Sequence, residues 1–268
     1  MIAFAANSLF ARLALAGGAI DAAGYTGVRM ASGAAFLALI LWRRPGRAGG
    51  LPGSWRAAAA LGVYAIGFSL AYLRLGVSLG ALVLFTAVQV TMIAWSVIRG
   101  EHPGRVEIAG IVLALAGFVY LVSPGLVAPD PLGCALMVIA GVAWGVYSIL
   151  GRGGADPVGQ TAGNFIRIVP MALPLIVVSL IAGGMTAYGV VLALAAGVFA
   201  SALGYILWYR ALPGLAMTQA AIVQLSVPVI AALGAVIFLS ETLTARLLIA
   251  GAVMLGGIAL AILSRRRA

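Results

Sequence analysis

The two halves of this chain carry matching residues in the same order, about 140 residues apart. Offsets that drift by only a few residues indicate a duplication with small insertions in the loops. A copy that crosses a membrane an odd number of times leaves its duplicate inverted. Inverted repeats place a binding site at the membrane midplane, where the copies meet, so the repetition predicts a transporter. The matched pairs, at offsets between 137 and 141 residues, are Ser8 with Ser148, Arg12 with Arg152, Arg29 with Arg167, Phe68 with Tyr205, Tyr72 with Tyr209, Glu101 with Glu241 and Gly110 with Gly251.

The chain is too apolar to fold in water. Its residues are 64% hydrophobic and 8% charged, with a mean hydropathy of +1.17, whereas soluble domains carry about 25% charged residues. A membrane-spanning helix needs ~20 mostly apolar residues, and turn signals separate ten such runs. The predicted fold is an all-α integral membrane protein with ten transmembrane helices, built as two inverted five-helix repeats over residues 1–124 and 131–268. The predicted spans are residues 2–19, 24–42, 57–75, 79–99, 106–123, 132–151, 161–181, 187–209, 216–238 and 246–264.

Arginine supplies every basic side chain apart from one histidine, because the sequence contains no lysine. Eleven arginines lie beside one alternating set of predicted loops and two beside the other. Cytoplasmic loops carry the excess of positive charge in membrane proteins. A lysine-free sequence rich in alanine, glycine and arginine is typical of GC-rich bacterial genomes. We therefore predict a multi-pass protein of a bacterial inner membrane, in contact with lipids, with both termini in the cytoplasm and no nucleic-acid partner.

The sequence does not contain a set of residues that would predict an enzyme active site. The acidic residues all lie in predicted loops or at span ends, and so does His102, the single histidine. A hydrolase needs a nucleophile with a base, or a metal cluster, and Cys134 is the one cysteine. Proton relays use acids or histidine inside the membrane. We expect no catalytic residues, no metal, no cofactor and no obligatory proton coupling.

Uncharged polar and aromatic side chains remain inside the predicted spans. Amide and hydroxyl groups can bind a small zwitterion by hydrogen bonds, and rings can stack on an apolar substituent. Taken alone, each residue is explained as well by helix–helix contact or by an interfacial aromatic belt. Taken together, they predict a lined central cavity. The substrate-binding candidates are Asn7, Tyr72, Gln89, Trp95, Trp144, Tyr147, Tyr205 and Gln224.

Three arginines interrupt predicted spans. Arg12, Arg29 and Arg167 lie within about two turns of a span end, from which long side chains can snorkel to the lipid headgroups. The other hypothesis is that one of them attracts a substrate carboxylate.

Prolines predict bending in two spans. Pro228 removes a backbone N–H and frees the carbonyl of Gln224, which predicts either a gating hinge or a plain kink. Pro170, with Pro174, predicts that its helix bends during gating.

The arrangement of these residues resembles the EamA-type repeat of the drug/metabolite transporter superfamily. The resemblance covers nearly the whole chain and depends on the motifs occurring twice. It implies two inverted repeats, cytoplasmic termini, and a central cavity lined by spans one, three, four, six, eight and nine. The first copy departs from the second, with Val88 where the second has Pro228, so the two hinges should differ. The residues that carry the resemblance are Arg29, Arg167, Glu101, Gly110, Pro228, Glu241, Gly251 and the Tyr209-Arg210-Ala211-Leu212 stretch.

Within that superfamily the chain looks most like the bacterial amino-acid exporters, including the aromatic amino-acid branch. The resemblance implies an inner-membrane exporter of amino acids and related small metabolites. We expect it to work by alternating access through a central uncharged, aromatic-lined cavity, facilitative rather than proton-driven, as a monomer or weak homodimer. Broad-specificity drug or metabolite efflux is the alternative. A membrane scaffold or lipid-binding protein is the hypothesis from a different class.

Overall fold

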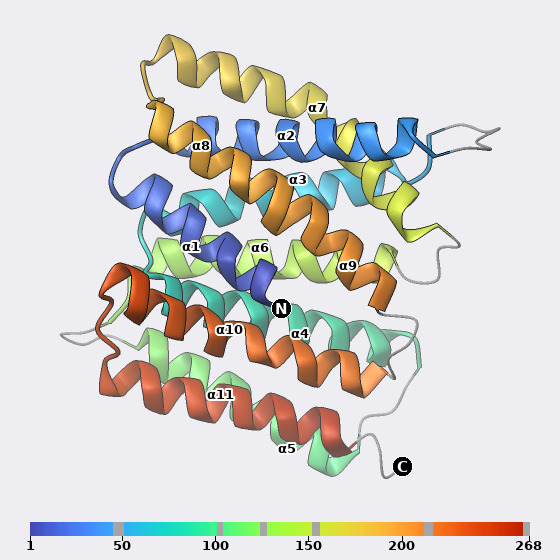
Figure 1. Cartoon of the computed structure of the whole chain (residues 1–268). Helices are drawn as coiled ribbons and strands as arrows, with labels where there is room; N and C mark the ends of the chain where they lie inside the picture. Colours follow the sequence, from blue (N-terminus) through green and yellow to red (C-terminus); the bar gives the residue numbers. More distant parts are fainter. Residues whose placement is uncertain (45–50, 101–103, 124–127, 152–155, 212–216, 265–268) are drawn as a thin grey trace.

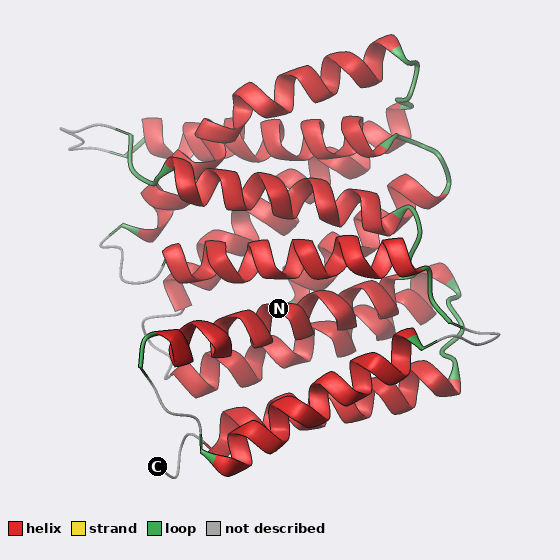
Figure 2. Cartoon of the chain, turned by 180° about the vertical axis from the view of Figure 1, so that it is seen from behind, coloured by secondary structure: helices red, strands yellow, loops and turns green. Residues whose placement is uncertain are grey.

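The protein is a bundle of helices in a computed structural model, which describes residues 1–44, 51–100, 104–123, 128–151, 156–211 and 217–264. Within these residues every regular element is a helix (Figure 2). The elements are α1 (Ile2–Ala16), α2 (Ala22–Trp42), α3 (Trp55–Tyr72), α4 (Val77–Ile98), α5 (Arg105–Val122), α6 (Pro131–Leu150), α7 (Pro157–Ile181), α8 (Ala187–Ala195), the π-helix η1 (Ala196–Leu203), α9 (Gly204–Ala211), α10 (Met217–Leu239) and α11 (Ala245–Ser264).

Because α8, η1 and α9 follow one another without a break, the described residues form ten helices. Five of these precede residue 124, and five follow residue 130. This confirms the predicted all-α membrane fold. Within the part of the chain that the structure describes, six helices are long and apolar enough to cross a bilayer: Ala22–Trp42, Val77–Trp95, Pro131–Leu150, Pro157–Ile181, Ala187–Ala211 and Ala245–Ser264.

Local capping explains where the predicted and observed helix ends differ. The helix α7 begins four residues before the predicted limit. Asp156 caps it by accepting a hydrogen bond from the Gly159 amide, and Pro157 occupies the first turn, where no backbone donor is needed. The helix α1 ends three residues early, because Gly17 and Gly18 follow and Gly18 adopts a φ of 64°.

Helices from the two halves of the chain pack together in matched pairs. The helix α2 packs along α7, α4 along α10 and α5 along α11. The helix α6 also packs on α3 and α4, while α1 packs on η1, α8 and α10. In Figure 1 the α2–α7 and α5–α11 pairs lie at opposite edges, with α1, α3, α4 and α6 between them. Both halves therefore build the centre, although the repeat limits at residues 1–124 and 131–268 stay a prediction.

The loops gather at two ends of the bundle (Figure 1). We call one the Glu241 end, formed by residues 17–21, 73–76, 128–130, 182–186 and 240–244, and the other the Asp156 end, formed by residues 43–44, 51–54, 99–100 and 156. Backbone bonds join two loops at the Glu241 end. The Asp21 amide donates to the Gly184 carbonyl at 2.8 Å, and the Thr186 amide donates to the Ala19 carbonyl at 2.9 Å.

Candidate functional site

A small cavity lies among α1, α3, α4, α6 and α9. It measures about 10 Å³, which is room for about one water molecule. Side chains therefore fill the centre in this conformation, and the hollow expected from the sequence is not open. The lining comes from spans one, three, four, six and eight. The lining residues are Phe4, Asn7, Tyr64, Phe68, Leu84, Phe85, Trp144 and Tyr205.

A column of aromatic rings in tilted and edge-to-face contact passes this cavity. Neighbouring ring centroids are 4.7 to 6.3 Å apart, and aromatic pairs at such distances stabilise each other by roughly 0.5–1.5 kcal/mol. Tyr205 joins the column at Trp144, with centroids 4.6 Å apart. The aromatic column comprises, in order, Tyr72, Phe68, Tyr64, Trp144, Tyr147 and Tyr209.

The aromatic column extends toward both ends of the bundle. The Tyr72 carbonyl at its first end accepts a hydrogen bond from Arg12, which borders the Glu241 end. At its other end, the Tyr209 hydroxyl lies beside Gly151, just past α6. The aromatic column therefore extends from near the Glu241 end to near the Asp156 end of the bundle.

Asn7, Tyr64 and Arg29 form a hydrogen-bonded chain beside the cavity. With the Asn7 amide as the structure assigns it, Nδ2 donates to the Tyr64 hydroxyl at 3.0 Å. Arg29 Nη2 donates to the same oxygen at 3.1 Å. The guanidinium also lies 5.2 Å from the Tyr64 ring centroid and 4.9 Å from that of Phe68, distances typical of cation–π contact.

Arg29 does not snorkel to the lipid headgroups. It is the eighth of the 21 residues of α2, which places it about 5 Å from the helix midpoint at 1.5 Å per residue. Its exposed fraction is 0%. The residues that line the cavity are uncharged, and the Arg29 guanidinium lies outside this lining, where it donates to the hydroxyl of the lining residue Tyr64.

A π-helical segment holds the other side of Arg29. Arg29 Nε donates to the Ser201 hydroxyl at 3.0 Å, and Ser201 lies in η1. Gly197 allows η1 to approach α2, because a Cβ there would overlap the Arg29 carbonyl and the Ser32 hydroxyl. Short π-helical segments are rare and frequently lie at functional sites. No feature of the sequence indicated this segment.

Gln89 and Gln224 meet between α4 and α10. Gln89 Nε2 donates to Gln224 Oε1 at 3.2 Å, and both side chains are buried. Pro228 lies one turn further along α10, which continues through it. Pro170 and Pro174 lie inside α7, whose axis changes direction in Figure 1. The hinge roles of Pro228 and Pro170 stay predictions.

The structure does not bring Trp95 to this centre. Its side chain is 40% exposed, and the Arg99 guanidinium lies 4.9 Å from its ring centroid at the Asp156 end of α4. A ring beside a cation at a helix end is typical of a membrane interface. The other sequence candidates line the cavity, belong to the aromatic column or form the Gln89–Gln224 pair.

Several cavity residues were not among the predicted site residues. Phe4, Leu84 and Phe85 are apolar, and no sequence signal separates them from ordinary core residues. Tyr64 and Phe68 do carry a signal. With Tyr72 they recur at every fourth position, and such spacing places side chains on one helix face.

A larger cavity of about 450 Å³ lies at the Glu241 end. Arg12, Arg246 and Glu241 are among its lining residues. Arg12 Nη1 donates to the Tyr72 carbonyl at 3.0 Å, so this cavity adjoins the aromatic column. Arg246 donates to the carbonyls of Tyr120 and Ser123.

Glu241 caps α4 from a distant part of the chain. Its Oε1 accepts from the Val77 amide at 2.6 Å, and its Oε2 accepts from the Ser78 amide at 3.2 Å and the Ser78 hydroxyl at 3.0 Å. A carboxylate at a helix N-terminus satisfies free amides and complements the helix dipole. Glu241 therefore ties the loop before α11 to α4.

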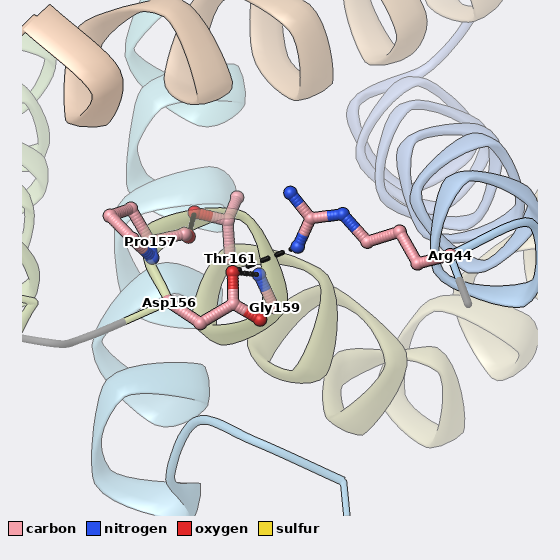
Figure 3. A network of polar contacts seen from close by, with 5 residues as sticks. All are labelled: Arg44, Asp156, Pro157, Gly159 and Thr161. Atoms are coloured by element: carbon pink, nitrogen blue, oxygen red, sulfur yellow. Dashed lines mark hydrogen bonds and ion pairs between the residues drawn. The ribbon is translucent and has the colours of Figure 1, made fainter. Parts of the chain in front are cut away.

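Polar contacts also close the Asp156 end. Asp156 Oδ1 accepts from Arg44 Nη1 at 2.9 Å and from the Gly159 amide at 3.0 Å, while the Thr161 hydroxyl donates to the Pro157 carbonyl at 2.8 Å (Figure 3). The Arg44–Asp156 pair is partly exposed, and such pairs contribute roughly 0–1 kcal/mol. The pair joins the end of α2 to the start of α7 without strongly locking them.

Arg167 makes different contacts from Arg29, its counterpart in the first half. Its guanidinium donates to the carbonyls of Leu51, Pro52 and Gly163 and so fixes the loop before α3. Of the other matched residues, Glu101 and Arg152 lie outside the described residues, as does His102.

The described acidic side chains lie at helix ends. Glu107 lies in the first turn of α5. No group of three or more His, Cys, Asp or Glu side chains within the described ranges could hold a metal ion. The acids that cap helices are Asp21 on α2, Asp130 on α6, Asp156 on α7 and Glu241 on α4.

A solved crystal structure shares this fold. The similarity has a TM-score of 0.67 and covers 99% of this chain and 96% of that one, at 21% sequence identity. At that identity it shows the arrangement of helices alone.

Sequence relatives identify the family. An uncharacterized protein of Pseudomonas aeruginosa is 48% identical over 265 residues, which are 99% of this chain and 92% of that protein. An uncharacterized transporter of Clostridium kluyveri is 24% identical over 71% of this chain and 67% of its own length. The uncharacterized inner membrane transporter YedA of Escherichia coli is 31% identical over 38% of this chain and 33% of its own length.

Residues 131–263 match the model of the EamA-like transporter family. The chain therefore belongs to the EamA-like transporter family, and it is a multi-pass membrane transporter rather than an enzyme.

Proposed function

We propose that the protein exports amino acids and related small metabolites across a bacterial inner membrane by alternating access. The observation that carries this proposal is the buried cavity at the middle of the aromatic column, with Asn7, Tyr64 and Tyr205 in its wall. Rings offer stacking for an apolar side chain, and amide and hydroxyl groups offer hydrogen bonds for a zwitterion. Together they match the mixed character of amino acids.

The filled centre corresponds to a closed intermediate of such a cycle. A cavity of about 10 Å³ holds no amino acid, so helices must separate before a solute binds. Movement at the Asp156 end would part α2 from α7, and movement at the Glu241 end would part α4 from the loop before α11. Pro170, Pro174 and Pro228 lie in helices that could bend as the ends open.

The distribution of arginine side chains supports one orientation of the protein in the membrane. Arg43, Arg44, Arg56 and Arg99 lie at or near the Asp156 end, and cytoplasmic ends carry the excess of arginine. We propose that this end faces the cytoplasm, as do both termini, and that the protein works as a monomer or weak homodimer.

The positions of the acids support facilitated transport or exchange. Asp21, Asp130, Asp156 and Glu241 each cap a helix at an end of the bundle, whereas proton relays use acids or histidine inside the membrane. The gradient of the solute itself then drives transport.

Flux in proteoliposomes tests this proposal. Vesicles that hold the purified protein and unlabelled amino acid should accumulate external labelled amino acid by exchange, with equal pH on both sides. A panel of aromatic, aliphatic and charged amino acids, with a lipophilic cation, would define the substrate class. Protein-free vesicles serve as the control.

Three outcomes would contradict parts of the proposal. Flux that appears only under a proton gradient would contradict the facilitative mechanism. Flux of the lipophilic cation without flux of amino acids would favour broad efflux. The absence of flux for every solute would favour a scaffold or lipid-binding role.

A further inference from the structure

Arg29 holds a positive charge that the described part of the protein leaves without an acidic partner. Its side chain is fully buried, and its Nη1 has no hydrogen-bond partner among the described residues. Two ion pairs are found within those residues, Arg44 with Asp156 and Arg74 with Asp130, and neither includes Arg29. One edge of the guanidinium is therefore free to bind another group.

The nearby acids along the chain are already engaged. Asp21 lies on the same helix as a cap, eight residues before Arg29, which is about 12 Å away along the axis. It accepts from the Gly24 amide at 2.6 Å. The other capping acids lie at the helix ends of the bundle, whereas Arg29 lies near the middle of α2.

Neutral neighbours stabilise Arg29 but leave its charge uncompensated. Ser201 and Tyr64 each accept one of its hydrogen bonds, and the Tyr64 and Phe68 rings add cation–π contacts. Arginine stays protonated in proteins. A buried ion without a counter-charge is strongly destabilising, and charged residues inside membrane helices commonly mark the solute path.

The polar atoms around Arg29 and the cavity form two sets. Tyr64 accepts from both Asn7 and Arg29, so its own hydrogen is free to donate. The Tyr205 hydroxyl has no partner among the described residues. Together with Arg29 Nη1, these donors suit an anion. Asn7 Oδ1, also unpartnered within the described residues, is an acceptor that suits an ammonium group.

We infer that Arg29 binds the carboxylate of the transported solute and that carboxylate-bearing molecules are the substrate class of this protein. The inference rests on the proposed function, because it names the group that the central site recognises on the solute. As the helices separate, the carboxylate reaches Arg29 Nη1 from the cavity side of Tyr64. The solute then supplies the counter-charge that the chain lacks.

The two arginines matched between the halves provide a control. Arg167 makes its hydrogen bonds to loop carbonyls at the Asp156 end, whereas Arg29 lies beside the cavity. Arg29→Gln and Arg167→Gln remove the same charge from matched positions. The inference expects carboxylate recognition to depend on the first position alone.

Ligand-induced thermal stabilisation of the purified full chain tests the inference with three probes. Phenylalanine carries both charged groups, phenylalaninamide lacks the carboxylate, and 3-phenylpropanoate lacks the ammonium. Wild type should need roughly 10- to 100-fold more amide than acid for equal stabilisation, the range expected for hydrogen bonds to a charged group. Arg29→Gln should abolish this preference, and Arg167→Gln should preserve it.

Three results would overturn the inference. The first is equal stabilisation of wild type by the acid and the amide, and the second is no stabilisation by either carboxylate. The third is an Arg29→Gln protein that retains the preference. If Arg29→Gln does not fold, Arg29→Lys tests the inference instead. This variant keeps the positive charge but loses the planar guanidinium that binds a carboxylate through two hydrogen bonds. It should bind the acids about tenfold more weakly and still prefer them, and undiminished affinity would count against the inference.

Transport measured alongside binding separates this inference from the proposed function. If 3-phenylpropanoate binds through Arg29 while labelled amino acids do not cross, amino-acid export is wrong and the carboxylate site stands. If amino acids cross while phenylalanine and its amide bind equally, export stands and the carboxylate site is wrong.

Discussion

Replacing Trp144 with alanine should lower exchange flux by at least about tenfold. Trp144 lies at the middle of the aromatic column, with ring centroids 4.6 to 5.9 Å from Tyr205, Tyr64, Tyr147 and Phe4. A ring contact between Trp144 and the solute would contribute up to about 1.5 kcal/mol, and the loss of that contact is enough for a tenfold effect. Initial exchange rates in proteoliposomes, normalised to folded protein, measure the change.

Trp95→Ala provides the matched control, since it removes the same side chain from an exposed position beside Arg99. Its flux should stay within about twofold of wild type, as expected for a substitution away from buried features. Trp144→Phe keeps a ring at the centre and should retain most of the flux. Equal losses in Trp144→Ala and Trp95→Ala would contradict the placement of the pathway along the aromatic column.

Gly257→Ala should strongly destabilise the protein. A Cβ at this position would lie 2.6 Å from the Gly110 carbonyl and 2.6 Å from the Ala114 amide, both backbone atoms of α5. Because backbone cannot move aside as a side chain can, α5 and α11 would have to separate. Overpacking of this kind costs roughly 1–3 kcal/mol or more. The midpoint of thermal unfolding in detergent should fall.

Gly256→Ala is the control for this substitution, one residue earlier on the same helix. A Cβ at this position would have no heavy atom of a neighbouring element within 4 Å. Alanine also favours the helix over glycine by up to about 1 kcal/mol, so stability should stay equal or rise slightly. If the two variants melt at the same temperature, the close packing of α5 on α11 is wrong.

The helices were predictable because lipid imposes a strong length and composition rule. The predicted limits of α2 and α11 fall within two residues of those observed. The predicted start of α7 at residue 161 is four residues late, because Asp156 forms an N-cap and Pro157 occupies the first turn of the helix. The π-helical hydrogen bonds of η1 leave no mark in the residue pattern.

The candidate site was less predictable, because side-chain direction depends on how helices rotate against each other. Arg29 and Arg167 occupy matched positions in the sequence, yet one lies at the centre and the other binds a loop. Trp95 and Trp144 are both tryptophans within apolar spans, and only Trp144 reaches the cavity. Gly256 and Gly257 are neighbours, and only Gly257 meets α5. Helix contacts, rather than residue type, decide these differences.

Cysteine accessibility at the cavity tests the central claim most directly. Leu84 lines the cavity and is 3% exposed, and Cys134 is the one native cysteine, so Leu84→Cys in a Cys134→Ala background carries a single reporter. Alternating access through this cavity predicts that a membrane-impermeant thiol reagent labels the reporter from either side of the membrane, and that bound solute slows both reactions. Labelling from one side only, or from neither side, would contradict the account.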